Sequence, residues 1–200
     1  GDSAQAVTLL GLVLREAPDD AGVLRLLAYA LVEAGSGAQA AAQAAAQVAG
    51  VTKVLTVANP ANAHPIAQVL APQIVKLADG YTHVFGPSST FGKDLMPCVA
   101  ALLGTGQVSD LMAVDGPHAF KRPIYAGNAI QTVKSRDGKK VMTIRTASFE
   151  AAGAGGSAPV ADAALAEDPA LSGWLNDEVA ASDRPELTSA GRVVSGGRGV

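Results

Sequence analysis

The sequence predicts an α/β fold: a three-layer, parallel-type sheet with flanking helices and a mostly β second half, preceded by an atypical helical N-terminal segment. Three observations support this prediction. From residue 51 to about residue 103, short apolar runs alternate with helix-like segments, which is typical of parallel strands joined by crossover helices. Beyond residue 103, short strand patterns are separated by turns. The first fifty residues instead repeat apolar side chains at helical spacing.

The composition is that of a folded domain. Of the 200 residues, 48% are hydrophobic and 16% are charged, so a sizeable core can form. The formal net charge is −3 at pH 7, so the chain lacks the basic field that selects nucleic acid or an anionic membrane. Every long apolar run is interrupted by charge, and we therefore expect no direct membrane insertion. Cys98 is the one cysteine, which excludes an internal disulfide and predicts a small buried side chain.

The first fifty residues are predicted to be three helices. Two apolar stripes with a 3.6-residue period are separated by Pro18, and Gly35 is placed to end the second helix. Residues 39–48 are almost entirely Ala and Gln, which are strong helix formers. The pattern resembles one tetratricopeptide-type hairpin. Because a single repeat cannot bury its own face, generic helices that cover a neighbouring sheet are the alternative.

The middle of the chain is predicted to alternate strand and helix. Residues 54–57 and 82–85 are short apolar runs typical of buried strands. Between them, residues 64–77 carry apolar side chains on one side of a helix. Pro72 predicts a kink or a break in that helix, because proline lacks the N–H that the helix needs.

A polar cluster of Ser88, Ser89 and Thr90 follows the second of these strands. These side chains are suited to cap a helix that reaches about residue 103, in which Pro97 predicts another kink or a later start. No Gly-x-Ser-x-Gly elbow surrounds them, so capping is favoured over a nucleophile. A phosphate cradle at the helix N-terminus is the other alternative.

The second half is predicted to be mostly β. Strand patterns occur at residues 110–114, 121–125, 129–133 and 140–146. Asp137-Gly138 predicts a hairpin turn between the last two. Residues 168–181 resemble an acidic helix, in which Trp174 is expected to be a packing anchor.

Four motifs from residue 91 onward are specific enough to compare with known families. They are FGKDLMP (91–97), FKRPIYAGNAI (120–130), IRTASF (144–149) and SDRPELT (182–188), the last followed by VVSGGRG (193–199). In this order they resemble the alpha subunit of an electron-transfer flavoprotein. A weaker likeness extends back to about residue 46. The first fifty residues depart from the family, which normally opens with strands.

The resemblance implies an electron carrier rather than an enzyme. In this family an alpha and a beta subunit form a heterodimer that carries electrons in one FAD. Electrons come from acyl-CoA dehydrogenases and related dehydrogenases in fatty acid β-oxidation, and pass to a membrane quinone oxidoreductase. The implied location is the bacterial cytoplasm or the mitochondrial matrix, of which the cytoplasm is favoured.

The same resemblance divides the chain into four segments. They are a helical segment (1–50), the alpha-subunit N-terminal α/β domain (51–160), a linker (161–190), and the first strand and glycine loop of a truncated FAD-binding domain (191–200). The α/β domain is implied to pack against the beta subunit. Because most of the FAD-binding domain is missing from such a fragment, we expect the chain alone to bind no FAD.

The predicted cofactor-binding residues are Ser195, Gly196, Gly197, Arg198 and Gly199. Glycines let the backbone turn sharply and approach a phosphate or a ring closely. By resemblance Arg198 contacts the flavin, where a cation stabilises the reduced form and raises its reduction potential. No catalytic residue is predicted.

The three histidines, His64, His83 and His118, lie far apart without metal-ligand spacing, and no metal site is expected. His64 is predicted to start a helix, and His83 to be a hydrogen-bonded sheet residue.

Arg122, Tyr125 and Asn128 form a recognisable cluster that either anchors a partner or only shapes a turn. Two other hypotheses for the chain remain. One is a helical-repeat protein-interaction module fused to an α/β remnant, and the other is a nucleotide-binding enzyme that uses residues 88–90.

Overall fold

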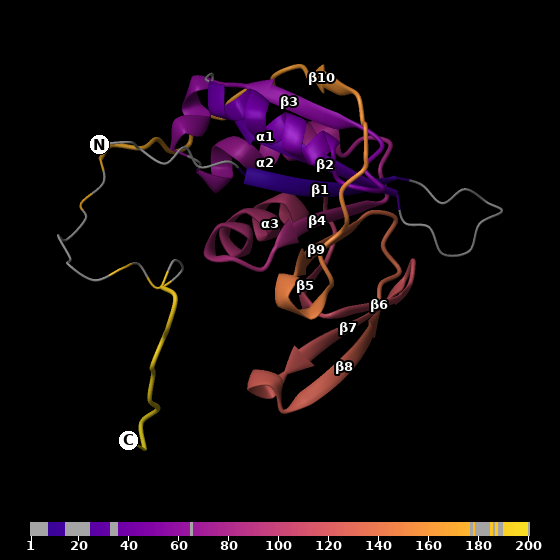
Figure 1. Cartoon of the computed structure of the whole chain (residues 1–200), viewed down its shortest axis with the longest axis vertical. Coiled ribbons are helices and arrows are strands. Elements are labelled where there is room, and N and C mark those ends of the chain that lie inside the picture. Colours follow the sequence, from indigo (N-terminus) through magenta and orange to yellow (C-terminus); the bar gives the residue numbers. More distant parts are fainter. Residues whose placement is uncertain are drawn as a thin grey trace.

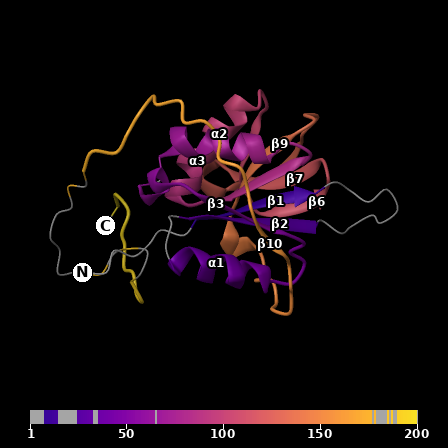
Figure 2. The same ribbon diagram turned by 90° about the horizontal axis from the view of Figure 1, so that it is seen from above.

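The computed structural model describes residues 8–14, 25–32, 36–64, 66–176, 178, 185, 187 and 190–199. In these residues a seven-stranded sheet lies beside a three-stranded sheet (Figure 1). Helix α1 (Ser36–Ala46) covers one face of the large sheet, and helices α2 (Ala67–Leu77) and α3 (Thr90–Leu102) cover the other (Figure 2). The predicted three-layer α/β fold is therefore confirmed.

The large sheet has the strand order β10-β3-β2-β1-β4-β9-β5. Its strands are β1 (Thr8–Leu14), β2 (Arg25–Val32), β3 (Val54–Ala58), β4 (His83–Pro87), β5 (Gln107–Leu111), β9 (Lys140–Ile144) and β10 (Val160–Asp162). Strand β1 runs antiparallel to both of its neighbours, β2 and β4, while all other adjacent pairs are parallel. The sheet is thus mainly parallel, as predicted.

Two of the three helices predicted for the first fifty residues are wrong. Residues 8–14 and 25–32 are strands of the large sheet, not a tetratricopeptide-type hairpin. Only the third predicted helix forms, as α1. Strands β2 and β1 lie in the middle of the sheet, where near-continuous apolar runs are normal. Such short runs fit a buried strand and a buried helix equally well by periodicity. Pro18 and Gly35 lie outside the described residues.

The predicted elements of the middle of the chain are confirmed within a few residues. Ser89 is the N-cap of α3, and its hydroxyl accepts a hydrogen bond from the Gly92 N–H at 3.3 Å. Helices α2 and α3 continue through Pro72 and Pro97, so neither proline breaks its helix. Helix α2 begins at Ala67, and His64 therefore does not start it.

Alternate side chains of the strands fill three hydrophobic clusters, as the period of two requires. The cluster between the sheet and helices α2 and α3 includes Leu55, Val84 and Val141. The cluster beneath α1 consists of Ala42, Ala45, Ala46, Val51 and Val54. The third joins the two sheets and consists of Phe85, Val108, Leu111, Phe120 and Met142.

The small sheet is an antiparallel meander of β6 (Ala113–Gly116), β7 (Ala119–Ile124) and β8 (Ala129–Lys134). The strand predicted at 110–114 is wrong, because the chain passes from β5 to β6, in the other sheet, at Met112. The hairpin predicted at Asp137-Gly138 is also wrong, since β9 pairs with β4 and β5 instead of β8. Local turn chemistry does not specify which sheet receives the next strand.

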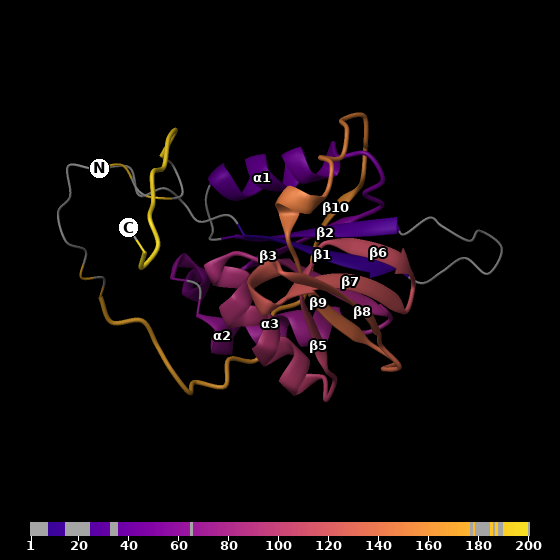
Figure 3. The same ribbon diagram turned by 90° about the horizontal axis from the view of Figure 1, so that it is seen from below.

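The segment after β10 is extended. Residues 168–176 form no helix, and Pro169, Gly173 and the positive φ of Ala170 (52°) account for this. Residues 193–194 pair with no strand among the described residues. The end of the chain lies apart from both sheets (Figures 1 and 3). No helix in the described part of the chain has the length and apolar character to cross a membrane.

Candidate functional site at the carboxyl edge of the large sheet

Three polar side chains meet where the parallel strands β4, β9 and β5 end. Ser88 follows β4, Arg145 follows β9, and Asp110 lies near the end of β5. The carboxyl ends of parallel strands form one edge of a sheet, which is where open α/β sheets commonly bind ligands. The topology therefore makes this edge the first place to look for a site.

The Asp110 carboxylate is the centre of this cluster. Its Oδ1 accepts a hydrogen bond from the Ser88 hydroxyl at 2.8 Å. Its Oδ2 accepts two from Arg145, from Nε at 3.1 Å and from the terminal nitrogen Nη2 at 2.5 Å. Both carboxylate oxygens are thus bound within the chain, so the cluster is an internal ion pair rather than an open ligand site.

The backbone of Asp110 is unusual as well. Its φ is 59°, in the left-handed region that aspartate tolerates better than most residues. The register of β5 against β9 shifts between Val108 and Leu111, and the Asp110 N–H turns to the buried hydroxyl of Thr143 at 2.9 Å. This bulge aims the carboxylate at Ser88 and Arg145.

The hydrogen bond from Arg145 is the main reason that the pKa of Asp110 lies below its usual value of 3.8. Burial opposes this shift, while the Ser88 hydroxyl and the charges of Arg145 and Lys93 add to it. A carboxylate that stays ionised and accepts three hydrogen bonds is poorly suited to general acid–base work. The arrangement instead ties together the ends of three strands.

The loop at Ser88, Ser89 and Thr90 has structural partners. Ser88 binds Asp110, and Ser89 caps α3. A Cβ on Gly92 would overlap the carbonyl oxygen of Pro87, so the first turn of α3 packs directly on the end of β4. The predicted capping role is confirmed for Ser89, and the Ser88 hydroxyl is engaged rather than presented to a substrate.

The buried histidine, His83, has the predicted sheet position. Its Nε2 lies 2.7 Å from the carbonyl oxygen of Pro117, and its Nδ1 lies 2.8 Å from the Thr82 hydroxyl. His64 stacks on Trp174, while His118 is exposed. No group of three or more potential metal ligands occurs among the described residues.

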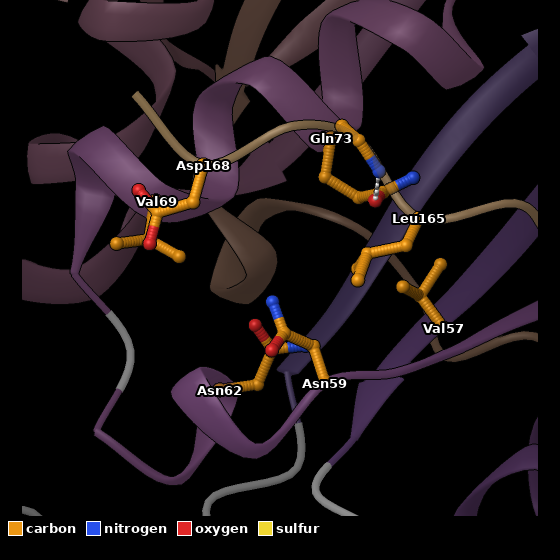
Figure 4. A pocket seen from close by; sticks show the side chains of 8 residues that line it. Val57, Asn59, Asn62, Val69, Gln73, Leu165 and Asp168 are labelled. Carbon is orange, nitrogen blue, oxygen red and sulfur yellow. Dashed lines mark hydrogen bonds between the residues drawn. The ribbon is translucent and has the colours of Figure 1, made fainter. Parts of the chain in front are cut away.

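A small pocket lies between the end of β3, helix α2 and the segment after β10 (Figure 4). Asn59 and Asn62 line it on one side, and Gln73 and Asp168 on the other. Asn62 and Gln73 are buried. Gln73 was not among the predicted site residues, although a polar residue on the apolar side of a predicted helix is a signal for such a role.

The predicted cofactor-binding residues, Ser195 to Gly199, are all exposed. They form an irregular segment with a turn at Arg198 and Gly199. A Cβ at Gly197 or Gly199 would meet no atom within 4 Å. The structure does not bring these residues to the carboxyl edge, and their role in binding FAD stays a prediction.

The cluster of Arg122, Tyr125 and Asn128 lies at the hairpin between β7 and β8. Arg122 donates from Nε to the Ser109 carbonyl at 2.9 Å and from Nη2 to the Ser109 hydroxyl at 2.8 Å. Tyr125 is 78% exposed, and its φ of 49° is strained for an aromatic residue. Arg122 therefore makes contacts within the domain, whereas Tyr125 lies exposed at the tip of the hairpin.

The fold, with its polar cluster at the carboxyl edge of the large sheet, is that of a three-layer α/β domain with a mainly parallel sheet. The family described as "Electron transfer flavoprotein domain" matches residues 27–171. The chain belongs to the electron transfer flavoprotein family, with the sequence of an alpha subunit.

Three relatives illustrate the similarity, and each is described as an electron transfer flavoprotein subunit alpha. That of Paracoccus denitrificans is 57% identical over 84% of this chain and 54% of its own length. That of Bradyrhizobium diazoefficiens is 56% identical over 82% and 52%. The mitochondrial protein of Dictyostelium discoideum is 45% identical over 84% and 52%. The chain thus spans about half the length of these relatives.

Proposed function

We propose that this chain supplies the subunit-packing domain of a heterodimeric electron carrier, with an electron-transfer flavoprotein beta subunit as its partner. The observation that supports this most is the family match over residues 27–171, which includes every element from α1 to β10. That the Asp110 carboxylate is bound by Ser88 and Arg145 within the chain also supports a carrier rather than an enzyme.

We further propose that the whole protein carries FAD. Electrons would come from acyl-CoA dehydrogenases and related dehydrogenases of fatty acid β-oxidation, and pass to a membrane quinone oxidoreductase. The proposed location is the bacterial cytoplasm or the mitochondrial matrix. FAD, when bound, supplies the one- and two-electron chemistry.

Residues 195–199 fit one side of such a site. Three of the five are glycines, which leave the backbone N–H groups accessible, and the Arg198 guanidinium is exposed. In the proposed role, the glycine backbone approaches the flavin and Arg198 favours its reduced form. As part of the same proposal, this chain alone binds no FAD.

Co-purification tests the proposed partner. The chain would carry an affinity tag and be co-expressed with an untagged beta subunit from the same source, and a stable one-to-one complex is expected. If the beta subunit co-purifies neither with this chain nor with the full-length alpha subunit, the proposal is contradicted.

Gel filtration after mixing with FAD tests the cofactor. We expect no flavin absorbance with the isolated chain, and one bound flavin per heterodimer with the full-length subunit. In the full-length heterodimer, an acyl-CoA dehydrogenase and its substrate should bleach the flavin absorbance. A full-length heterodimer without flavin would refute the carrier function.

A further inference from the structure

The segment from β10 onward is held against the body of the domain mainly by polar contacts. We call residues 160–174 the strap. It begins as β10, which pairs in parallel with β3. The Ala163 N–H continues this pairing by donating to the Thr56 carbonyl at 2.8 Å. After Ala163 the strap leaves the sheet and runs along helix α2.

Gln73, on α2, binds the strap with both atoms of its amide. Its Nε2 donates to the Ala164 carbonyl at 3.2 Å, and its Oε1 accepts from the Ala166 N–H at 2.6 Å. In a parallel ladder, one residue likewise bonds the carbonyl before and the N–H after its opposite residue. The Gln73 amide thus takes the place of a strand residue opposite Leu165.

Further contacts from α2 and its N-terminal side continue along the strap. Lys76 Nζ donates to the Leu165 carbonyl at 2.8 Å. The Ser172 hydroxyl donates to Gln68 Oε1 at 2.6 Å. At the end of the strap, the indole of Trp174 stacks on His64 with ring centroids 3.6 Å apart.

Ala161 and Ala163 pack on the cluster between the sheet and helices α2 and α3, but beyond Ala163 apolar packing adds less to this attachment. Leu165 is 49% exposed and Leu171 is 75% exposed, so both leave much of their surface in solvent. Gln73, in contrast, is only 4% exposed, and a buried amide needs both of its hydrogen-bonding atoms satisfied. The position of the strap therefore depends on the Gln73 amide more than on hydrophobic burial.

We propose that Gln73, assisted by Lys76, is a positioning residue that clamps the strap and so fixes the point near Trp174 from which the chain leaves the domain. In terms of the proposed function, on which this consequence rests, the clamp sets where the connection to the flavin-binding loop begins. The clamp itself requires neither flavin nor a partner subunit.

Hydrogen exchange of the 200-residue chain, measured by NMR or mass spectrometry, tests the clamp. Gln73→Met keeps the length and approximate volume of the side chain and removes both hydrogen bonds. Because two bonds are lost, exchange of the Ala166 amide should rise about tenfold or more. The Ala163 amide, which binds the Thr56 carbonyl instead, should keep its exchange rate and is an internal reference.

Trp174 is the one tryptophan of this chain, so its fluorescence reports on the end of the strap. In Gln73→Met we expect a red shift of its emission and greater quenching by acrylamide, because release of the clamp separates the indole from His64. Gln43→Met, the same substitution at an exposed glutamine of α1, should change neither the exchange nor the emission.

The outcomes separate clearly. Faster exchange at Ala166 together with the emission shift supports the clamp. Unchanged exchange at Ala166, or faster exchange with unchanged Trp174 emission, overturns it. If Gln73→Met also accelerates exchange in β4 and β9, the fold has been lost. In that case the test uses Lys76→Met, which removes only the exposed contact to the Leu165 carbonyl. Exchange of the Ala166 amide and the emission of Trp174 should then change in the same directions, by smaller amounts. Because no readout involves flavin or the beta subunit, a failed clamp leaves the electron-carrier proposal intact.

Discussion

The guanidinium of Arg145, just after β9, holds the carboxylate of Asp110 in β5 through hydrogen bonds from Nε and Nη2. The two residues are far apart in the chain, and the parallel pairing of β5 with β9 brings them together. Ser88, after β4, completes the contact from the third strand. Since these partners satisfy both oxygens of Asp110, the pair is a structural feature whose strength depends on the charge of the carboxyl group.

The first prediction concerns pH. The folded state lowers the pKa of Asp110 below its usual value of 3.8, so the unfolded chain binds the proton more readily. The pair therefore stabilises the fold above about pH 4, and this contribution is lost as the pH falls through the lowered pKa. Asp110→Asn should reduce the urea-unfolding free energy at pH 7, and the difference from wild type should shrink towards pH 3.

Asparagine also tolerates a positive φ, so this substitution tests the charge and not the bulge. In an Arg145→Met background, Asp110→Asn should show a much smaller pH-dependent difference, because the largest cause of the pKa shift is gone. An equal loss of stability at pH 7 and pH 3 would show that the charge of Asp110 is not involved.

The second prediction concerns Gly92. A Cβ at this position would overlap the backbone carbonyl of Pro87, which cannot move without shifting β4. Gly92→Ala should lower the free energy of unfolding by about 1–3 kcal/mol, the usual cost of overpacking. The matched control is Gly138→Ala, where a Cβ would meet no atom within 4 Å. Equal urea midpoints for the two variants would contradict the close approach of α3 to β4.

The third prediction assigns the proton of His83. The Pro117 carbonyl can only accept a hydrogen bond, so Nε2 must carry the proton in the bond of 2.7 Å. In the neutral ring, Nδ1 then accepts from the Thr82 hydroxyl at 2.8 Å. Nitrogen chemical shifts measured by NMR should show a protonated Nε2.

His83→Phe tests the strength of the same contact. It keeps an aromatic ring but removes the donor to the Pro117 carbonyl, at the turn between β6 and β7. We expect a loss of about 1–3 kcal/mol in unfolding free energy. Thr82→Val removes only the contact to Nδ1 and should cost less. An Nδ1–H ring in the NMR spectra would contradict the assignment.

The fourth prediction concerns the hairpin tip. Tyr125 is 78% exposed with a φ of 49°, and Ile130 on β8 is 53% exposed. Strained and exposed aromatic residues are candidates for partner contacts. If the proposed beta subunit binds this tip, Tyr125→Ala should weaken the complex about tenfold or more in a titration and leave the melting temperature of the isolated chain nearly unchanged.

Leu102→Ala, at a residue of α3 that is 57% exposed, is the control and should leave the affinity unchanged. Unaltered binding by Tyr125→Ala would instead favour the alternative in which this cluster only shapes a turn. Arg122 is unsuitable for this test, because its guanidinium braces Ser109 within the chain.

Local sequence patterns were sufficient to predict the α/β class, the family and the elements of the middle of the chain. Strand β3 and helix α3 were predictable because their signals are local: a short apolar run rich in β-branched residues, and a serine placed to cap a helix. The motifs from residue 91 onward were likewise sufficient for the family, which the match over residues 27–171 confirms.

The other features could not be predicted in this way, because they depend on which segments lie side by side in the folded chain. Residues 8–14 and 25–32 are strands since they lie in the middle of a sheet, a context that an apolar run cannot reveal. Asp110 meets Arg145, and Gln73 meets the strap, through contacts between residues distant in sequence. Hydrogen bonds of this kind are set by the arrangement of strands and helices, which no local pattern specifies.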